Sequence, residues 1–429
     1  MLREEGRETM AGGLSGGEPE TFVVVGASMA GASAVETLRR EGFAGRVVLV
    51  GAEPHLPDER PPLSKGLLTG AVPEGQVFLR DAAFYAAQQV ELRLGTRATA
   101  LDLPGRALAL EGGERLRFDK LLVATGGEAR RLALPGGDLP GVVALRTLDD
   151  ARALRAALVS VAAAGGRVVV VGAGFIGAEV ASACRRLGIA VTLLEALPAV
   201  LGRVLGGDMG AVLSAIHRAE GVDVRLGEAI AAVRGAERAE QVVTASGAEI
   251  ACALVVMGVG MRPADAWLRG SGLALGDGVL VDAFCETEAP GVFAAGDAAN
   301  WPYHLTGERV RLEHYDNALR QGEAAARNML GQRRPFAPVP YFWSDQYDLK
   351  LQYVGHAHAW DHMVVRGQTA GRSFIAFYLQ AGRLRAALAV NRVREVGALK
   401  RLIAAEVAPE AAALTDEAVA LRSLLPAPA

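Results

Sequence analysis

Short apolar runs followed by amphipathic segments dominate the first two thirds of the chain. The clearest begins at Arg167, which precedes four consecutive valines, a pattern typical of a strand buried on both faces of a parallel sheet. A glycine-rich turn, a helix-like segment and a second apolar run ending at Glu195 follow it. This order predicts a strand, a helix and a second parallel strand over residues 167–195.

Three glycines occupy fixed places in the turn of this unit: Gly172, Gly174 and Gly177. In a dinucleotide-binding fingerprint the first permits the turn, the second lets the backbone approach a pyrophosphate, and the third allows close helix–strand packing. A carboxylate at the end of the second strand, here Glu195, accepts from a ribose hydroxyl. The glycine spacing alone is weak evidence, but here it follows a predicted strand and opens a predicted helix, which is the context that the fingerprint requires.

A second unit of this kind lies near the start of the chain. The run Thr21–Val25, apolar after its threonine, precedes Gly26, Ser28 and Gly31, and a helix and a strand ending at Glu53 follow. Ser28 replaces the middle glycine; its hydroxyl could donate to a phosphate, but the left-handed freedom of glycine is lost. Two such units in one chain predict two dinucleotides, FAD and NAD(P).

Between and after these units the pattern predicts further elements. Expected helices cover residues 148–164, 208–220, 316–330 and a stretch from 393, and expected strands include residues 349–354, 373–379 and 384–390. Residues 127–148 are rich in glycine and proline, a composition typical of a crossing between domains. In the segment 58–68, Pro61 and Pro62 predict an extended loop as far as Ser64, which would hold Arg60 and Lys65 in fixed places.

Composition indicates a multidomain globular protein: 429 residues, 51% of them hydrophobic and 22% charged. The net charge of −3 argues against nucleic-acid binding, and no apolar run is long enough to span a membrane. Residues 1–20 are rich in Gly and Glu and lack the apolar core of a signal peptide. We therefore expect a disordered extension over residues 1–20 and a cytoplasmic protein.

The cysteines and the histidines offer little evidence for a metal site. The three cysteines are far apart in sequence and form no redox pair or ligand set, so we expect buried apolar side chains: Cys184, Cys252 and Cys285. His356 and His358 would share a face of a strand, with His362 nearby. No cysteine or glutamate joins these histidines at ligand spacing, so we expect no bound metal.

The order of motifs resembles the flavoprotein ferredoxin reductases of bacterial oxygenase systems (the rubredoxin, putidaredoxin and biphenyl-dioxygenase ferredoxin reductases), which are related to apoptosis-inducing factor. The resemblance covers nearly the whole chain from Thr21. It rests on Gly26–Gly31, Glu53, Arg60–Lys65, Ala124–Gly126, Gly172–Glu179, Gly296-Asp297, Glu313-His314 and Tyr341–Tyr347.

This resemblance implies an α/β fold with two Rossmann-like dinucleotide-binding domains and a C-terminal α+β domain. The NAD-binding domain, residues 131–256, would be inserted in an FAD-binding domain made of residues 21–130 and 257–335. The C-terminal reductase domain would cover residues 336–429. We expect a monomer or a weak homodimer.

The resemblance also implies roles for individual residues. Around FAD it places Gly26, Ser28 and Gly31 at the pyrophosphate, Glu53 at the adenine ribose, Arg60 by the phosphates, and Thr125, Gly126, Gly296 and Asp297 on the flavin side, with Asp297 accepting from a ribityl hydroxyl. Around NAD it places Gly172, Gly174 and Gly177 at the pyrophosphate, with Glu195 and Arg203 beyond them. Lys65 and Glu179 would be the catalytic ion pair beside the isoalloxazine, flanked by Glu313, His314 and Trp343.

The cysteine pattern narrows the chemistry. Related disulfide reductases, NADH oxidases and peroxidases need an early cysteine, and none precedes Cys184. The remaining role is that of a flavin that takes a hydride from NADH and releases two single electrons. The expected acceptor is a small acidic 2Fe–2S ferredoxin or a rubredoxin that serves an oxygenase. The alternatives are an NADH dehydrogenase acting on quinones or dyes, a monodehydroascorbate-type reductase, or a slow NAD-sensing flavoprotein.

A basic segment near the C-terminus could dock such an acidic partner. Residues 366–401 contain a single acid, Glu395, against eight bases: Arg366, Arg372, Arg383, Arg385, Arg392, Arg394, Lys400 and Arg401. This asymmetry can steer an acidic protein, or it can be a solvated face balanced by acids elsewhere. We expect docking above Trp343, with Arg383, Arg392 and Arg394 taking part.

Overall fold

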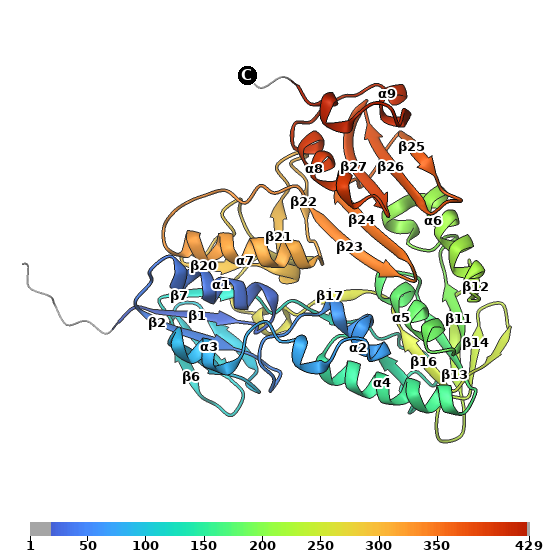
Figure 1. The fold of residues 1–429 in the computed structure, drawn as a ribbon. Coiled ribbons are helices and arrows are strands. Elements are labelled where there is room, and N and C mark those ends of the chain that lie inside the picture. The colour runs from blue at the N-terminus through green and yellow to red at the C-terminus, as the bar shows by residue number, and fades with distance from the viewer. Residues whose placement is uncertain (1–18, 427–429) are drawn as a thin grey trace, which may run out of the picture.

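A five-stranded parallel sheet is built on the first apolar run in the computed structural model, which describes residues 19–426 (Figure 1). Its strand order is β20-β7-β1-β2-β3. The bounds are β1 Thr21–Val25, β2 Arg46–Val50, β3 Val90–Arg93, β7 Lys120–Val123 and β20 Val292–Ala294. The central strands are continuous runs of buried Val and Leu, as expected when helices cover both faces. Helices α1 (Met29–Arg40) and α7 (Tyr315–Met329) lie against each other over this first sheet.

A second parallel sheet is built on the four valines after Arg167. Its order is β12-β11-β10-β16-β9, and its strands and helices lie in sequence between β7 and β20 of the first sheet. The bounds are β9 Val142–Ala144, β10 Arg167–Val171, β11 Ala190–Glu195, β12 Asp223–Leu226 and β16 Leu254–Met257, with helices α4 Leu148–Ala163, α5 Phe175–Arg186 and α6 Gly202–Ala219. The second unit is therefore inserted into the first.

A five-stranded antiparallel sheet follows, in the order β23-β24-β27-β26-β25. Its elements are β23 Tyr341–Gln346, β24 Leu349–Gly355, β25 His362–Gln368, β26 Ser373–Gln380, β27 Arg383–Val390, α8 Val396–Ala404 and α9 Ala411–Thr415. One face packs on the core that includes α5 and α6, and the other forms a core with α8. Figure 1 shows β23 between α7 and α5, so this C-terminal sheet meets both parallel units.

Smaller elements complete the described chain. One antiparallel sheet consists of β4 Ala98–Asp102, β5 Ala107–Leu110 and β6 Arg115–Arg117, and another consists of β13 Ile230–Arg234, β14 Gln241–Thr244 and β15 Glu249–Ala251. A four-stranded sheet consists of β18 Leu275–Gly276, β19 Gly278–Leu280, β21 Ala299–Pro302 and β22 Arg309–Val310. The remaining elements are the strand pair β8 Gly127–Ala129 and β17 Met261–Pro263 and the helices α2 Gly66–Thr69 and α3 Ala82–Ala87. The pair β8–β17 joins the two crossings between the parallel sheets, since β8 follows β7 and β17 follows β16.

The expected α/β class, both strand–helix–strand units and the helix over residues 148–164 are confirmed. The helix expected from residue 208 begins earlier, at Gly202, and bends at Gly206, whose φ is 76°. The expectation of an extended loop before Ser64 is wrong, because residues Pro61–Ser64 form a turn of 3₁₀ helix. Proline is accepted in a first helical turn, where its missing N–H has no intrahelical partner to lose.

The structure does not test the expected N-terminal extension or the expected domain boundaries. The expected disordered extension falls mostly on residues 1–18, outside the described part of the chain. The domain boundaries remain a prediction. Within residues 19–426, no helix combines the length and the apolar character needed to cross a membrane.

Candidate active site

Both glycine-rich turns lie where a central parallel strand ends and a helix begins. β1 passes into α1 through Gly26 and Ser28, and β10 passes into α5 through Gly172 and Gly174. The unpaired N–H groups of a helix's first turn and its dipole favour a bound anion at this place. Gly26 and Gly172 have φ values of 119° and 95°, a conformation that side chains rarely adopt. Each turn therefore has the backbone geometry that a pyrophosphate site needs.

The other glycines of the two turns have different reasons to lack a side chain. A Cβ on Gly31 or on Gly177 would lie 1.9 Å from the carbonyl oxygen of the first glycine in the same turn, so both are required by helix–strand packing. Gly174 has a φ of −74°, and a Cβ built on it meets no atom within 4 Å. Neither the conformation nor the packing of the protein requires glycine there. The open space fits the close approach of a ligand's pyrophosphate.

Ser28 occupies the position equivalent to Gly174 and is unstrained. Its φ is −129°, so the cost expected from losing glycine's left-handed freedom does not arise. Its hydroxyl donates to the carbonyl oxygen of Asp58 at 3.1 Å, so it does not point freely toward a phosphate as we expected. Ser28 instead fixes the loop that carries Arg60 against the start of α1.

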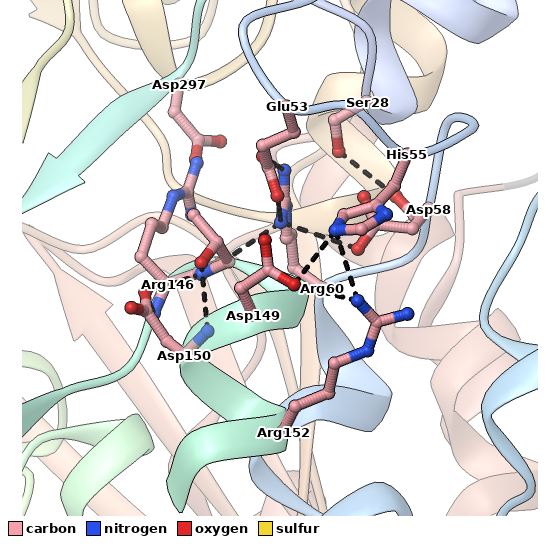
Figure 2. Close-up of polar contacts among 11 residues, drawn as sticks. Ser28, Glu53, His55, Asp58, Arg60, Arg146, Asp149, Asp150, Arg152 and Asp297 are labelled. Carbon is pink, nitrogen blue, oxygen red and sulfur yellow. Dashed lines mark hydrogen bonds and ion pairs between the residues drawn. The ribbon is translucent and has the colours of Figure 1, made fainter. Parts of the chain in front are cut away.

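Figure 2 shows a charged cluster around Arg60 at this end of the first sheet. Its guanidinium forms an ion pair with both carboxylate oxygens of Glu53 and lies 3.4 Å from Asp58 Oδ2. Arg60 Nη1 also donates to the carbonyl oxygen of Arg146, whose own Nη2 donates to Asp297 Oδ2 at 3.1 Å. Glu53, Arg60 and Asp297, which we expected around FAD, therefore converge through an arginine that we did not expect.

Unsatisfied polar atoms in this cluster supply a test of fit for FAD. Asp58 is buried, and this burial raises the pKa of its carboxyl group, with Arg60 offsetting only part of the effect. Asp58 Oδ2 and Arg60 Nε are both buried and have no hydrogen-bond partner among residues 19–426. A buried acceptor beside a buried donor suits a ligand that presents hydroxyl and phosphate groups together. The residues present thus fit FAD.

The flavin-side residues lie close to the same cluster. Gly126 has a φ of 65°, and a Cβ on it would lie 2.9 Å from Arg146 Nη2. Thr125 Oγ1 donates to the carbonyl oxygen of Ala264 at 2.9 Å. The Gly296 N–H donates to Gln321 at 2.9 Å, which fixes the turn just before Asp297.

The second fingerprint is closed by its carboxylate. Glu195 Oε2 accepts from the N–H of Ala173 at 2.6 Å, and Oε1 accepts from the N–H of Leu197 at 2.9 Å. Glu195 therefore stands directly at the glycine turn, where we expected it for NAD. Arg203 lies exposed in the first turn of α6.

Lys65 and Glu179 form the expected ion pair, with Lys65 Nζ 2.9 Å from Glu179 Oε2. Only 3% of the Glu179 side chain is exposed, against 18% of the Lys65 side chain. Ser64 Oγ donates to Glu179 Oε2 at 2.5 Å, and Ser344 Oγ donates to Oε1 at 2.6 Å. Two segments far apart in sequence, residues 64–65 and β23, thus meet at one carboxylate of α5. The pair itself is confirmed; its place beside the flavin stays a prediction.

The three residues expected to flank the flavin differ in their surroundings. His314 directly precedes α7, and its ring centroid lies 4.5 Å from that of Phe342. Burial lowers the pKa of His314 to about 3, so its ring is neutral at ordinary pH. Trp343 is half-buried, and its ring centroid lies 5.4 Å from that of Tyr315. Glu313 is exposed and is paired with Arg311 at 2.8 Å.

Cys184 and Cys285 are buried as expected, whereas Cys252 is only partly buried. His356 and His358 lie in the loop after β24 and not on a strand. Cys184, Cys252 and Cys285 are free, and burial raises the pKa of the Cys184 thiol to about 12, so it is a poor nucleophile. Among residues 19–426 no three His, Cys, Asp or Glu side chains gather at metal-binding distance.

Comparison with known proteins identifies the family. A family model described as pyridine nucleotide-disulphide oxidoreductase matches residues 20–322, and one described as reductase C-terminal matches residues 341–425. The chain belongs to the pyridine nucleotide-disulphide oxidoreductase family. Membership implies FAD as the bound cofactor, and it makes NADH a substrate rather than a resident group. No described cysteine pair gives this member the dithiol of the family's name.

Relatives within this family match nearly the whole chain. The chain is 40% identical to the biphenyl dioxygenase system ferredoxin–NAD(+) reductase component of Paraburkholderia xenovorans (strain LB400), over 95% of this chain and 99% of that protein. It is also 40% identical to the anthranilate 1,2-dioxygenase system ferredoxin–NAD(+) reductase component of Burkholderia cepacia, with the same coverage. The crystal structure of the covalent putidaredoxin reductase–putidaredoxin complex contains a chain with a TM-score of 0.91 and 33% identity, covering 95% of this chain and 98% of that one.

Sequence reasoning missed several residues that complete these contacts. Asp58 and Ser64 stand within the segment 58–68 that we singled out, so proximity to Arg60 and Lys65 was a usable signal. Arg146 lies within the glycine- and proline-rich crossing of residues 127–148 and belongs to no motif. Ser344 and Gln346 lie within the run Tyr341–Tyr347, and their spacing of two on a strand is the only local sign that they share a face.

Proposed function

We propose that this chain is the ferredoxin–NAD(+) reductase component of an oxygenase system and passes electrons from NADH through FAD to a small acidic 2Fe–2S ferredoxin or a rubredoxin. The observation that carries the proposal is the buried Lys65–Glu179 pair, which links the loop after the first dinucleotide turn to the helix after the second. The relatives that match over nearly the full length are named as such reductases. We propose with it the domain division stated above and a monomer or weak homodimer.

The residues would act by binding and electrostatics. FAD supplies the capacity to accept a hydride and to release electrons singly. The amide groups at Gly26–Gly31 would hold its pyrophosphate, with Arg60 and Asp58 offering a donor and an acceptor nearby. Beside the flavin, Lys65 would place an ammonium where negative charge develops during hydride transfer, and Glu179 would hold that ammonium in place.

The visible spectrum of the purified protein tests this proposal. We expect bound flavin absorption that is bleached by NADH without oxygen and recovers when ferredoxin is added. A protein that binds no flavin after refolding with FAD, or one whose flavin NADH leaves oxidised, would contradict the proposal.

NADH should be preferred over NADPH by about tenfold or more in kcat/KM, since repulsion worth about 1.4 kcal/mol gives that factor. Glu195 would accept from the ribose 2′-OH and repel a 2′-phosphate. Glu195→Gln keeps an acceptor oxygen for the Ala173 N–H but removes the charge. This variant should therefore have a smaller ratio of kcat/KM for NADH to kcat/KM for NADPH. Higher efficiency with NADPH in the unaltered protein would overturn the assignment.

The basic segment 366–401 is less available for docking than its sequence indicates. Arg366 is buried and donates to backbone carbonyls. Three further arginines pair with acids outside the segment: Arg372 with Glu220 and Asp348, Arg385 with Glu406, and Arg392 with Glu417. The choice of Arg392 as a docking residue is therefore weakened, because its charge is compensated. Lys400 is a better candidate, since its ammonium lies 4.0 Å from the centroid of the Tyr341 ring, in the strand that carries Trp343.

Lys400→Glu should raise the KM for ferredoxin by about tenfold at low salt, where steering of an acidic partner is strongest. Turnover with ferricyanide should stay nearly constant, because a small inorganic acceptor needs no docking. Arg117→Glu makes the same charge change on β6, on the opposite side of the molecule, and serves as the matched control (Figure 1). Equal ferredoxin kinetics in both variants would eliminate this docking face.

A further inference from the structure

A chain of buried hydrogen bonds ends on the Glu179 carboxylate. Ser344 Oγ donates to Glu179 Oε1 at 2.6 Å, and Gln346 Nε2 lies 3.1 Å from Ser344 Oγ. Gln346 Oε1 lies 3.0 Å from Nε2 of His217, and Nδ1 of His217 lies 2.7 Å from the Tyr347 hydroxyl. The chain thus runs over four hydrogen bonds from Tyr347 to the carboxylate that holds Lys65.

The members come from separate elements, and all of them except the half-buried Tyr347 are buried. Ser344 and Gln346 share one face of β23 in the C-terminal sheet and are 0% exposed, and His217, on α6, is 1% exposed. Glu179 lies on α5, so the hydrogen bonds connect two helices of the second parallel unit, α5 and α6, with the C-terminal sheet. Each of these side chains forms hydrogen bonds with its neighbours in the array. Breaking one bond would leave buried polar groups without a partner, which would destabilise the protein.

The carboxylate sets the direction of every bond. An ionised Glu179 can only accept, so the single hydroxyl proton of Ser344 must point to it. Ser344 Oγ then accepts from the Gln346 amide NH₂, which turns the Gln346 carbonyl toward His217. His217 must therefore carry its proton on Nε2 and accept from the Tyr347 hydroxyl on Nδ1. The amide orientation and the tautomer, which are otherwise ambiguous, follow from one charge.

The protonation states at the far end support this direction. Burial lowers the pKa of His217 to about 4, with the bond to Gln346 offsetting part of the effect, so its ring is neutral at ordinary pH. Burial raises the pKa of the Tyr347 hydroxyl, which therefore stays protonated and can donate.

We propose that Ser344, Gln346 and His217 are positioning residues of the reductase, which hold the Glu179 carboxylate oriented toward Lys65. This inference rests on the function proposed above. The array is not a proton path, because the Gln346 amide cannot pass a proton on without becoming an imidic acid. Its effect on hydride transfer is exerted through Glu179, and it makes the geometry of the ion pair depend on the packing of α6 and β23.

The direction of the chain can be read from the tautomer of His217 by ¹⁵N NMR on histidine-labelled holoprotein. We expect His217, assigned by the loss of its resonances in His217→Gln, to be the Nε2–H tautomer between about pH 5.5 and 8.5, since it titrates well below this range. In Glu179→Gln the new amide keeps its oxygen toward Lys65 and Ser64 and donates to Ser344. Every bond then reverses, so His217 should change to the Nδ1–H tautomer, while the exposed His362 keeps its spectrum.

A kinetic arm tests the positioning role. Gln346→Met keeps the side chain's length and removes both hydrogen bonds. The limiting rate of flavin reduction by NADH should fall about tenfold, which corresponds to about 1.4 kcal/mol in the barrier, because Ser344 loses the donor that fixes its hydroxyl toward Glu179. The Kd for NADH should change little. His362→Gln serves as control and should reduce at the unaltered rate.

The two arms separate this inference from the proposed function. If NADH does not reduce the flavin of the wild-type protein, the proposed function is wrong. The tautomer of His217 in Glu179→Gln would still show the direction of the hydrogen bonds. Retention of the Nε2–H tautomer in Glu179→Gln, or flavin reduction at the wild-type rate in a folded Gln346→Met, would overturn the inference.

Discussion

Lys65→Met should slow the reduction of the flavin by NADH by about a hundredfold and lower the flavin's reduction potential. Methionine keeps the length of the side chain but leaves the Glu179 carboxylate, 3% exposed, without its counter-ion. An uncompensated buried charge costs about 3–5 kcal/mol, and about 2.7 kcal/mol in the barrier corresponds to a hundredfold change in rate. A lone carboxylate also disfavours the negative charge that hydride transfer delivers. Stopped-flow reduction and a redox titration measure the two effects.

Single and double variants that remove the charge of Lys65, of Glu179 or of both separate the effect of the ion pair from the effect of each residue. Glu179→Gln should leave FAD bound and mainly weaken the positioning of the nicotinamide within hydride reach, roughly 3–3.5 Å. The double variant Lys65→Met/Glu179→Gln should be reduced faster than Lys65→Met, because it contains no unpaired buried carboxylate. Wild-type reduction rates in both single variants would remove the pair from the mechanism.

Gly177→Ala should lower the stability of the protein, whereas Gly174→Ala should weaken NADH binding and leave stability nearly unchanged, although both glycines lie in one turn. A Cβ on Gly177 would lie 1.9 Å from the carbonyl oxygen of Gly172, so α5 must move away from β10. We expect a loss of several kcal/mol in the free energy of unfolding, about the upper range for a single core substitution. Denaturant unfolding followed by circular dichroism measures this loss.

Gly174→Ala should leave stability within about 1 kcal/mol of the original, because the new methyl group meets no protein atom within 4 Å. The same methyl group would occupy the space for the pyrophosphate, so the KM for NADH should rise about tenfold or more. An unchanged KM for NADH in Gly174→Ala would show that no pyrophosphate approaches this turn.

Local pattern was sufficient for the parts of the fold that are local. The valines after Arg167, the positions of Gly172 and Gly177 and the carboxylate at Glu195 define a unit whose contacts lie within about thirty residues, so the sequence alone predicted it. The run Pro61-Pro62 was misjudged because proline is compatible with both an extended loop and a first helical turn.

The polar contacts of the site could not be predicted in the same way. The Lys65–Glu179 pair was expected only through a family resemblance, since 114 residues separate its members and no periodicity relates them. The bond from Arg146 to Asp297 and that from His217 to Gln346 join positions 151 and 129 apart. The free charge of the basic segment was overestimated for the same reason, because its partners Glu220, Glu406 and Glu417 lie outside it.

Anaerobic turnover with a panel of purified 2Fe–2S ferredoxins and rubredoxins, measured beside quinones and ferricyanide, tests the central claim most directly. We expect NADH to reduce at least one of the iron–sulfur or iron proteins with a kcat/KM about a hundredfold above that for any quinone, and this efficiency should fall as salt is added. Quinone reduction at equal or higher efficiency, with every protein acceptor left oxidised, would contradict the account.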